Sequence, residues 1–169
     1  MSYNSPKRQC FVTENFLCDE LFFMKRKNKF DSPLNLCQPM KNTLILLVDD
    51  DLDDREIFFE ATQQIGPWLK CLTVSTVKEA LEMLRTNFFR PDFIFTDLRM
   101  PAYDGKYFLR ELIANPCFNK IPVFIYTTTS SVAQKEECLK LGAAGFITKP
   151  WKLEDIISTI KKVVLSKIR

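Results

Sequence analysis

The strongest constraint on the fold is a regular alternation of short, β-rich apolar runs with longer helical patterns, which begins near residue 40. The runs at 44–48 and 123–126 are almost wholly apolar, as expected for strands that are buried on both faces of a sheet. The alternation predicts an α/β domain with a parallel sheet covered by helices on both sides. The expected strands are 44–48, 71–74, 93–96, 123–127 and 145–148, and the expected helices are 54–65, 76–84, 106–115, 131–141 and 152–168.

Composition excludes several classes of protein. The 169 residues are 46% hydrophobic with a formal net charge of +3, which is too small to argue for nucleic-acid binding. The chain has no histidine, so hydrolases with a Ser-His-Asp or Cys-His site and zinc sites with histidine ligands are excluded. No apolar run approaches the roughly 18 residues of a membrane span, so we expect neither nucleic acid nor membrane as a partner.

The six cysteines include no C-x-x-C pair, and the N-terminus lacks the layout of a secretory signal. We therefore expect reduced, mostly buried thiols in a cytoplasmic protein, with a set of disulfides as the alternative. Residues 1–40 show no sustained period. They are expected to be a flexible or non-native extension, with a docking arm as the alternative, and residues 41–169 are expected to form the compact domain.

Polar residues follow four of the expected strands, and the carboxyl ends of parallel strands lie at one edge of a sheet. Asp49 and Asp50 follow the first strand, Asp97 follows the third, Thr127 ends the fourth and Lys149 follows the fifth. Three close carboxylates repel one another, and a hard divalent cation such as Mg²⁺ relieves that repulsion. A carboxylate, Mg²⁺, an ammonium and a hydroxyl around one point fit phosphoryl transfer onto Asp97.

Other interpretations of the acidic run at 49–54 are weaker. Asp53 or Asp54 is expected to cap the first helix, because aspartate after a strand often serves this role. The spacing partly imitates a calcium-binding loop, but Asp54 stands where such a loop needs glycine. The motif of haloacid-dehalogenase-type phosphatases and the glycine-rich motifs of nucleotide binding are absent.

Four sequence blocks, at 46–51, 97–105, 121–128 and 145–150, closely resemble the receiver domain of two-component response regulators, the CheY-like family. The resemblance runs from about residue 41 to 168 with the blocks in order. It implies a flavodoxin-like (βα)₅ fold with strand order 2-1-3-4-5.

The resemblance also implies roles for single residues. Asp97 would be the phospho-acceptor, and Lys149 would contact the phosphoryl oxygens. Mg²⁺ would be bound by Asp50, Asp97 and the backbone carbonyl of Arg99, with Asp49 acting partly through water. The Arg99 side chain could shield the acyl phosphate or pair with an aspartate of the site.

Two further features follow from the resemblance. Thr127 and Phe146 would form a conformational switch, in which Thr127 turns inward and Phe146 follows it. Many family members carry tyrosine where Phe146 stands, and phenylalanine lacks the hydroxyl that can donate a hydrogen bond. The bond between Lys149 and Pro150 is expected to be a cis peptide.

The resemblance implies a signalling switch and not a classical enzyme. No output domain follows the last helix, so we expect a stand-alone receiver that accepts phosphate from a histidine kinase or a histidine phosphotransfer protein. Its output would be contact with a downstream protein, or a homodimer, through the fourth helix, fifth strand and fifth helix around Phe146, Lys152 and Glu154. The alternative is a receiver-like interaction module that works without phosphorylation.

Overall fold

A computed structural model describes residues 42–86, 89–129 and 131–167, all of which fall within the unit Gln38–Arg169. The expectation for residues 1–40 lies outside the described residues. The strands are β1 (Thr43–Val48), β2 (Leu69–Val74), β3 (Phe93–Thr96), β4 (Val123–Thr127) and β5 (Gly145–Thr148). The helices are α1 (Leu52–Ile65), α2 (Val77–Arg85), α3 (Gly105–Ala114), α4 (Val132–Lys140) and α5 (Leu153–Lys167).

The five strands form one parallel sheet in the order β2-β1-β3-β4-β5. This confirms the predicted flavodoxin-like α/β fold. The chain passes from β1 to β2 on one side and then returns to place β3 on the other side of β1. The strand order therefore reverses between β1 and β3, and in open α/β sheets ligands bind at the carboxyl ends of strands beside such a point.

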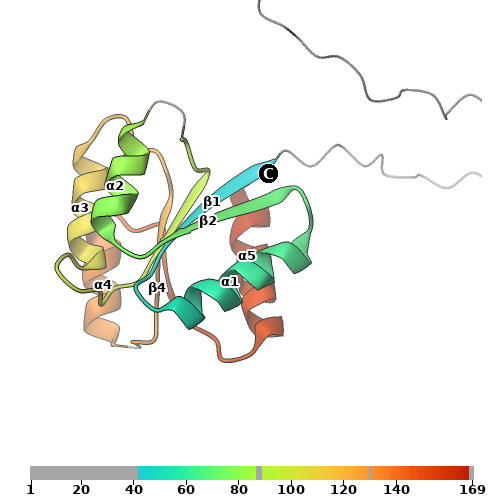
Figure 1. The fold of residues 1–169 in the computed structure, drawn as a ribbon. Helices are drawn as coiled ribbons and strands as arrows, with labels where there is room; N and C mark the ends of the chain where they lie inside the picture. Colours follow the sequence, from blue (N-terminus) through green and yellow to red (C-terminus); the bar gives the residue numbers. More distant parts are fainter. Residues whose placement is uncertain (1–41, 87–88, 130, 168–169) are drawn as a thin grey trace, which may run out of the picture. The chain divides into compact units, whose positions relative to one another are not determined.

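Helices cover both faces of the sheet, with α1 and α5 on one side and α2, α3 and α4 on the other (Figure 1). Each face has its own apolar core. Phe58 of α1 and Ile160 of α5 are fully buried in the first, and Leu84 of α2 and Phe108 of α3 are fully buried in the second. Two-sided burial explains why β1, β3 and β4 are apolar without alternation. Among the described residues, no helix is long and apolar enough to cross a membrane.

The start of α1 corrects one sequence-based expectation. The N-cap is Asp51, whose Oδ1 accepts hydrogen bonds from the backbone N–H groups of Asp53 at 2.9 Å and Asp54 at 3.4 Å. Neither Asp53 nor Asp54 caps the helix, because α1 already begins at Leu52. The acidic run offers several candidate caps, and the position at which β1 ends selects among them. The side chain of Asp54 is thereby released for another contact.

Candidate functional site

The register between β1 and β3 brings two aspartates together. Val48 pairs with Thr96, and the backbone N–H of Asp97 donates to the Val48 carbonyl at 2.8 Å. The residues that follow this pair, Asp49 and Asp97, therefore leave the sheet side by side. One oxygen each from Asp49, Asp50 and Asp97 lies within 4.8 Å of the others. The predicted acidic cluster is thus assembled, with Asp49 and Asp97 buried and Asp50 exposed.

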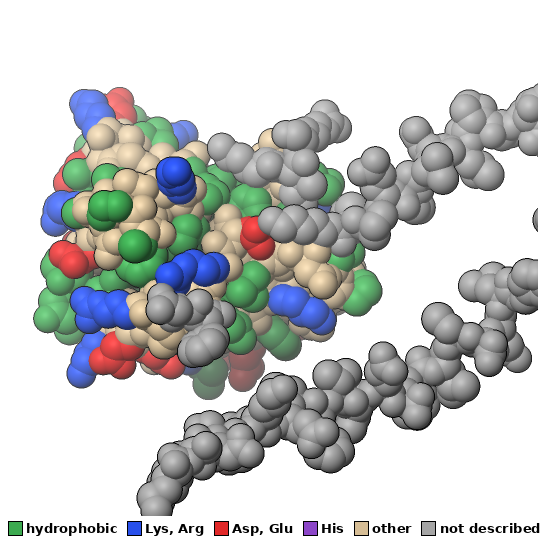
Figure 2. All heavy atoms as spheres, turned by 90° about the horizontal axis from the view of Figure 1, so that it is seen from above, with side chains coloured by type: hydrophobic (Ala, Val, Ile, Leu, Met, Phe, Trp, Pro, Cys, Tyr) green, Lys and Arg blue, Asp and Glu red, His purple; other side chains and the backbone are tan. Residues whose placement is uncertain are grey.

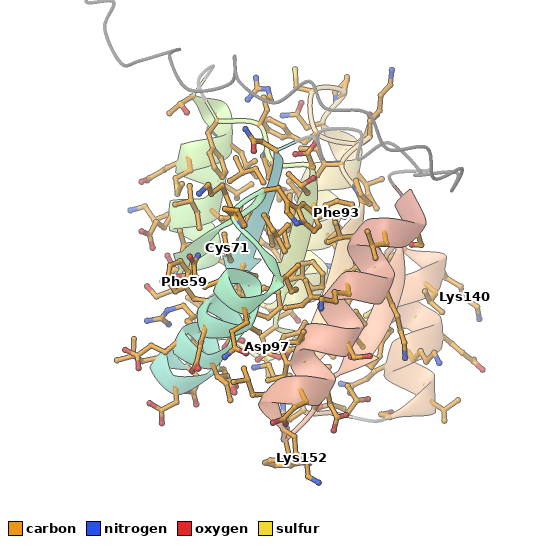
Figure 3. All side chains as sticks on the ribbon, turned by 90° about the vertical axis from the view of Figure 1, so that its right-hand side faces the viewer. Phe59, Cys71, Phe93, Asp97, Lys140 and Lys152 are labelled. Carbon is orange, nitrogen blue, oxygen red and sulfur yellow. The ribbon has the colours of Figure 1, made fainter. Side chains whose placement is uncertain are left out.

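Lys149 enters the same site from the other side of the sheet. Its backbone N–H donates to the Thr127 carbonyl at 2.8 Å, which continues the pairing of β5 with β4. Its Nζ lies 2.7 Å from Oδ2 of Asp49 and 2.7 Å from Oδ2 of Asp54. Figure 3 shows Asp97 at the end of the sheet near which α1 and α5 begin. The predicted lysine therefore lies among the carboxylates, although its described ion pairs do not include Asp97.

Burial determines the electrostatics of this group of side chains. Burial raises the pKa of Asp49 to about 6, although the hydrogen bond and charge of Lys149 act in the opposite direction. Burial lowers the pKa of Lys149, but its hydrogen bonds to Asp49 and Asp54 outweigh this effect and raise that pKa above its ordinary value. At neutral pH the two side chains are consequently an ionised pair, because the pKa of the acid lies below 7 and that of the base is raised.

Asp97 has a carboxylate oxygen with neither a hydrogen bond nor an ion pair among the described residues, whereas the similarly unbonded Oδ2 of Asp49 has the ammonium group of Lys149 beside it. Asp97 is 8% exposed, and its buried Oδ1 has no hydrogen-bond donor among the described residues. Its Oδ2 accepts a long hydrogen bond of 3.3 Å from the backbone N–H of Arg99. A carboxylate oxygen that is buried without a donor is costly, so this atom is expected to bind a cation or to react.

Asp54 is the site residue that the sequence reasoning missed. We expected a helix cap, whereas the structure gives Asp54 an ion pair with a lysine 95 positions away. Arg55 reinforces the arrangement by donating from its Nη1 to the Asp49 carbonyl at 2.7 Å. No local signal distinguishes Asp54 from Asp53, because the assignment depends on which aspartate of the run caps α1.

The side chain of Arg99 contacts Thr128 in this structure, and its shielding of an acyl phosphate stays a prediction. Its Nη2 donates to the hydroxyl of Thr128 at 3.2 Å, and its side chain forms no described ion pair with an aspartate of the site. The guanidinium therefore links the segment after β3 to the segment that follows β4 through one hydrogen bond. The role of the Arg99 carbonyl as a metal ligand stays a prediction.

The Lys149–Pro150 bond was predicted wrongly. The described residues contain no cis peptide bond, so this bond is trans. For a residue followed by proline, the trans isomer is favoured by about 0.5–1 kcal/mol. Lys149 reaches the site with this ordinary isomer.

The two residues predicted to form a switch lie on neighbouring strands. Thr127, at the end of β4, is fully buried, and its hydroxyl oxygen accepts a 3.4 Å hydrogen bond from the backbone N–H of Thr129. Phe146 of β5 pairs in register with Ile125 of β4 and is partly buried against the core on the side of α2, α3 and α4. Their movement on phosphorylation stays a prediction.

Gly105, the first residue of α3, lies against the backbone of the site. A Cβ atom added there would lie 2.2 Å from the carbonyl oxygen of Asp97. The backbone N–H of Gly105 also donates to the Leu98 carbonyl at 3.1 Å. Only glycine permits this approach, so the start of α3 helps to position the segment that carries Asp97.

The donor set fits a hard divalent cation. Three carboxylates supply only oxygen atoms, which suit Mg²⁺ better than zinc or copper. The unsatisfied Oδ1 of Asp97 and the clustering of the three side chains are what such an ion would compensate.

The fold is a doubly wound α/β domain, and the site lies where the strand order reverses. The site consists of the buried Asp97 with Asp49, Asp50, Thr127 and Lys149 at the same edge of the sheet. This combination of fold and site defines the class of protein. The chain belongs to the family of response regulator receiver domains, whose model matches residues 45–161. Receiver domains are phospho-accepting signalling switches of two-component systems. The recognition made from the sequence is confirmed.

Individual relatives agree with this assignment. The chain is 34% identical over 124 residues to the transcriptional regulatory protein ZraR of Escherichia coli and 30% identical over 130 residues to the two-component response regulator ARR7 of Arabidopsis thaliana. These alignments use 73% and 72% of this chain but span only 26% and 62% of the two relatives. The crystal structure of the phosphorylated cyanobacterial phytochrome response regulator RcpA is similar with a TM-score of 0.66 and 28% identity, covering 72% of this chain and 91% of that one.

Proposed function

We propose that this receiver domain accepts a phosphoryl group on Asp97, in a Mg²⁺-dependent reaction, from a phosphohistidine of a histidine kinase or a histidine phosphotransfer protein. The observation that carries the proposal is the buried Oδ1 of Asp97, which lacks a donor beside two further carboxylates and an ammonium group. The similar RcpA structure is described as phosphorylated, which supports the same chemistry here.

Each residue has a role in the transfer. The Asp97 carboxylate attacks phosphorus, a new P–O bond forms, and the P–N bond of the phosphohistidine breaks to leave the imidazole. Mg²⁺, held by Asp49, Asp50, Asp97 and the Arg99 carbonyl, would offset negative charge on the phosphoryl oxygens. Lys149 would donate to these oxygens through an ammonium N–H.

Phosphorylation would be converted into a change of shape through Thr127 and Phe146. Among the described residues, the only hydrogen bond of the buried Thr127 hydroxyl is a long one, so little opposes its turning to donate to a phosphoryl oxygen. Its movement would open space beside β5, and the partly buried Phe146 could turn to fill it. Phenylalanine fills such a space with apolar surface alone.

The output of the switch is proposed to be a protein contact, with a downstream protein or a second copy of the chain, on the face formed by α4, β5 and α5. Val132 and Leu139 of α4 are exposed apolar side chains, and Phe146 lies on the adjacent strand. Lys152 and Glu154, both exposed, would add charged contacts at the start of α5. On the face seen in Figure 2, lysine and arginine are interspersed with aspartate and glutamate, which does not favour nucleic acid as the partner.

Acetyl phosphate with Mg²⁺ tests the proposal without a kinase. We expect the intact protein to gain the mass of one phosphoryl group and to lose it again in hydroxylamine, because acyl phosphates are labile. Asp97→Asn should gain nothing, and Asp104→Asn, which alters another aspartate outside the cluster, should behave as wild type. Phosphorylation of Asp97→Asn to the wild-type extent would refute Asp97 as the acceptor. The absence of any mass gain in the wild type, with partner binding intact, would favour the phosphorylation-independent module.

A further inference from the structure

The ammonium group of Lys149 is held by a carboxylate outside the predicted catalytic set. Its Nζ lies 2.7 Å from Asp54 Oδ2 and equally far from Asp49 Oδ2, so two carboxylates share it. No described hydrogen bond joins Lys149 to Asp97, the proposed acceptor. In this structure the lysine therefore contacts the segment that joins β1 to α1 and the first turn of α1.

The position of Asp54 is fixed by the way α1 is attached to β1. Asp51 caps the helix by accepting from the N–H groups of Asp53 and Asp54, and Arg55 donates to the carbonyl of Asp49 at 2.7 Å. The first turn of α1 is thus fixed by its N-cap, and Arg55 ties it to the residue that follows β1. This anchoring holds the Asp54 carboxylate over the ammonium, although the Asp54 side chain is itself about one-third exposed.

Building on the proposed function, we propose that Asp54 is a positioning residue that holds Lys149 while Asp97 is unphosphorylated and competes for it once Asp97 carries a phosphoryl group. An ammonium has only three N–H donors. In this structure Asp54 accepts a hydrogen bond from one of them, and Asp49 forms an ion pair with the same nitrogen. Asp54 also adds negative charge beside the ammonium group that, in the proposed function, would contact the phosphoryl group. Removal of the Asp54 charge should therefore strengthen the hold of Lys149 on a phosphoryl group.

A purely structural role for Asp54 is the alternative. An acidic residue in the first turn of a helix interacts favourably with the helix dipole wherever its side chain points. Asp53 provides the matched control, because it lies in the same turn, is exposed, and forms no described ion pair with Lys149. Asp53→Asn and Asp54→Asn remove the same charge from adjacent positions, and only the second removes the contact with the lysine.

Titration with beryllofluoride in the presence of Mg²⁺ measures the competition, because this anion imitates a phosphoryl group on aspartate. Trp151, which is 91% exposed and two residues from Lys149, provides a fluorescence signal. We expect Asp54→Asn to bind beryllofluoride about threefold to fivefold more tightly than Asp53→Asn, a difference that corresponds to the free energy of a partly exposed ion pair. Asp54→Glu, which keeps the charge, should return the affinity toward that of the wild type.

Hydrogen exchange of the Lys149 ammonium, followed by ¹⁵N NMR without metal or anion, gives a second readout. Asp54→Asn should exchange at least about threefold faster than Asp53→Asn, because a protecting acceptor is lost. Equal affinities and equal exchange rates in the two variants would overturn the inference, as would weaker beryllofluoride binding in Asp54→Asn. Failure of the wild type to bind beryllofluoride at all would instead overturn the proposed function, and the inference with it.

Discussion

At the scale of single residues, Asp49 shows how burial and charge oppose each other in the site. Its side chain is fully buried, and the nearby Lys149, together with a hydrogen bond from the backbone N–H of Asp51, limits the rise of its pKa. Between pH 3.8, the ordinary pKa of an aspartate, and a pH of about 6, Asp49 is therefore mostly protonated in the folded protein and mostly ionised in the unfolded chain. In the absence of metal, this group therefore lowers stability progressively as the pH rises from about 4 to about 6.

The same pKa predicts how Mg²⁺ binding depends on pH. Because a protonated carboxyl group binds Mg²⁺ poorly, and Asp49 is protonated below a pH of about 6, the association constant should fall about tenfold between pH 7 and pH 5. Isothermal titration calorimetry at several pH values would measure this. Asp49→Asn should bind more weakly at pH 7 and show a flatter dependence. A wild-type association constant that stays constant down to pH 5 would contradict the prediction.

Cysteine reactivity is a second prediction at this scale. Burial raises the pKa of Cys71 to about 12, and Cys138 is fully buried with a pKa that burial also raises, whereas Cys117 is exposed. Iodoacetamide at pH 8 should alkylate Cys117 more than about tenfold faster than Cys71 or Cys138, because the thiolate is the reactive form and must be accessible. Peptide mapping by mass spectrometry would measure the rates.

The control for that experiment is the protein in denaturant, where all three thiols should react at similar rates. Rapid alkylation of Cys71 in the folded protein would contradict the burial of this β2 residue in the core on the side of α1 and α5. The three thiols are free in the structure, which agrees with the expectation of reduced cysteines for this part of the chain.

At the scale of elements, the segment from β3 to α3 depends on one glycine. Gly105→Ala would place a Cβ 2.2 Å from the Asp97 carbonyl oxygen, and the backbone of either β3 or α3 would have to move. We expect a loss of about 1–3 kcal/mol in the free energy of unfolding, which is typical of overpacking, measured by urea denaturation. Phosphorylation by acetyl phosphate should also slow, because Asp97 would be displaced.

Ala114→Gly offers a comparison at the other end of α3. It should cost about 1 kcal/mol or less through helix propensity and leave phosphorylation unchanged. If Gly105→Ala proved as stable and as readily phosphorylated as the wild type, the close approach of α3 to Asp97 would be incorrect.

At the scale of the whole molecule, the acidic edge predicts that the domain is stabilised by its metal. A ligand that binds only the folded state adds about 2.7 kcal/mol when present at 100 times its dissociation constant. Thermal unfolding with saturating Mg²⁺ should therefore occur at a higher temperature than with a chelator. Asp50→Asn, which removes one oxygen ligand, should show little or no increase. Identical unfolding curves for the wild type with Mg²⁺ and with the chelator would contradict the proposed metal site.

The sequence by itself determined the α/β class, because apolar runs and helical periods depend on which residues neighbour one another along the chain. It also identified Asp49, Asp50, Asp97, Thr127 and Lys149, since residues after parallel strands must meet at one edge of the sheet. Resemblance added the strand order, which the structure confirms.

Only the tertiary structure decided which partner each charged group takes. In the structure Asp51 caps α1, Asp54 forms an ion pair with Lys149, and the Arg99 guanidinium donates a hydrogen bond to Thr128. The Lys149–Pro150 bond is trans. These outcomes depend on distances of a few ångströms between segments as far as 95 residues apart. A local pattern carries no information on such distances, because they follow from how the strands register and how the helices pack.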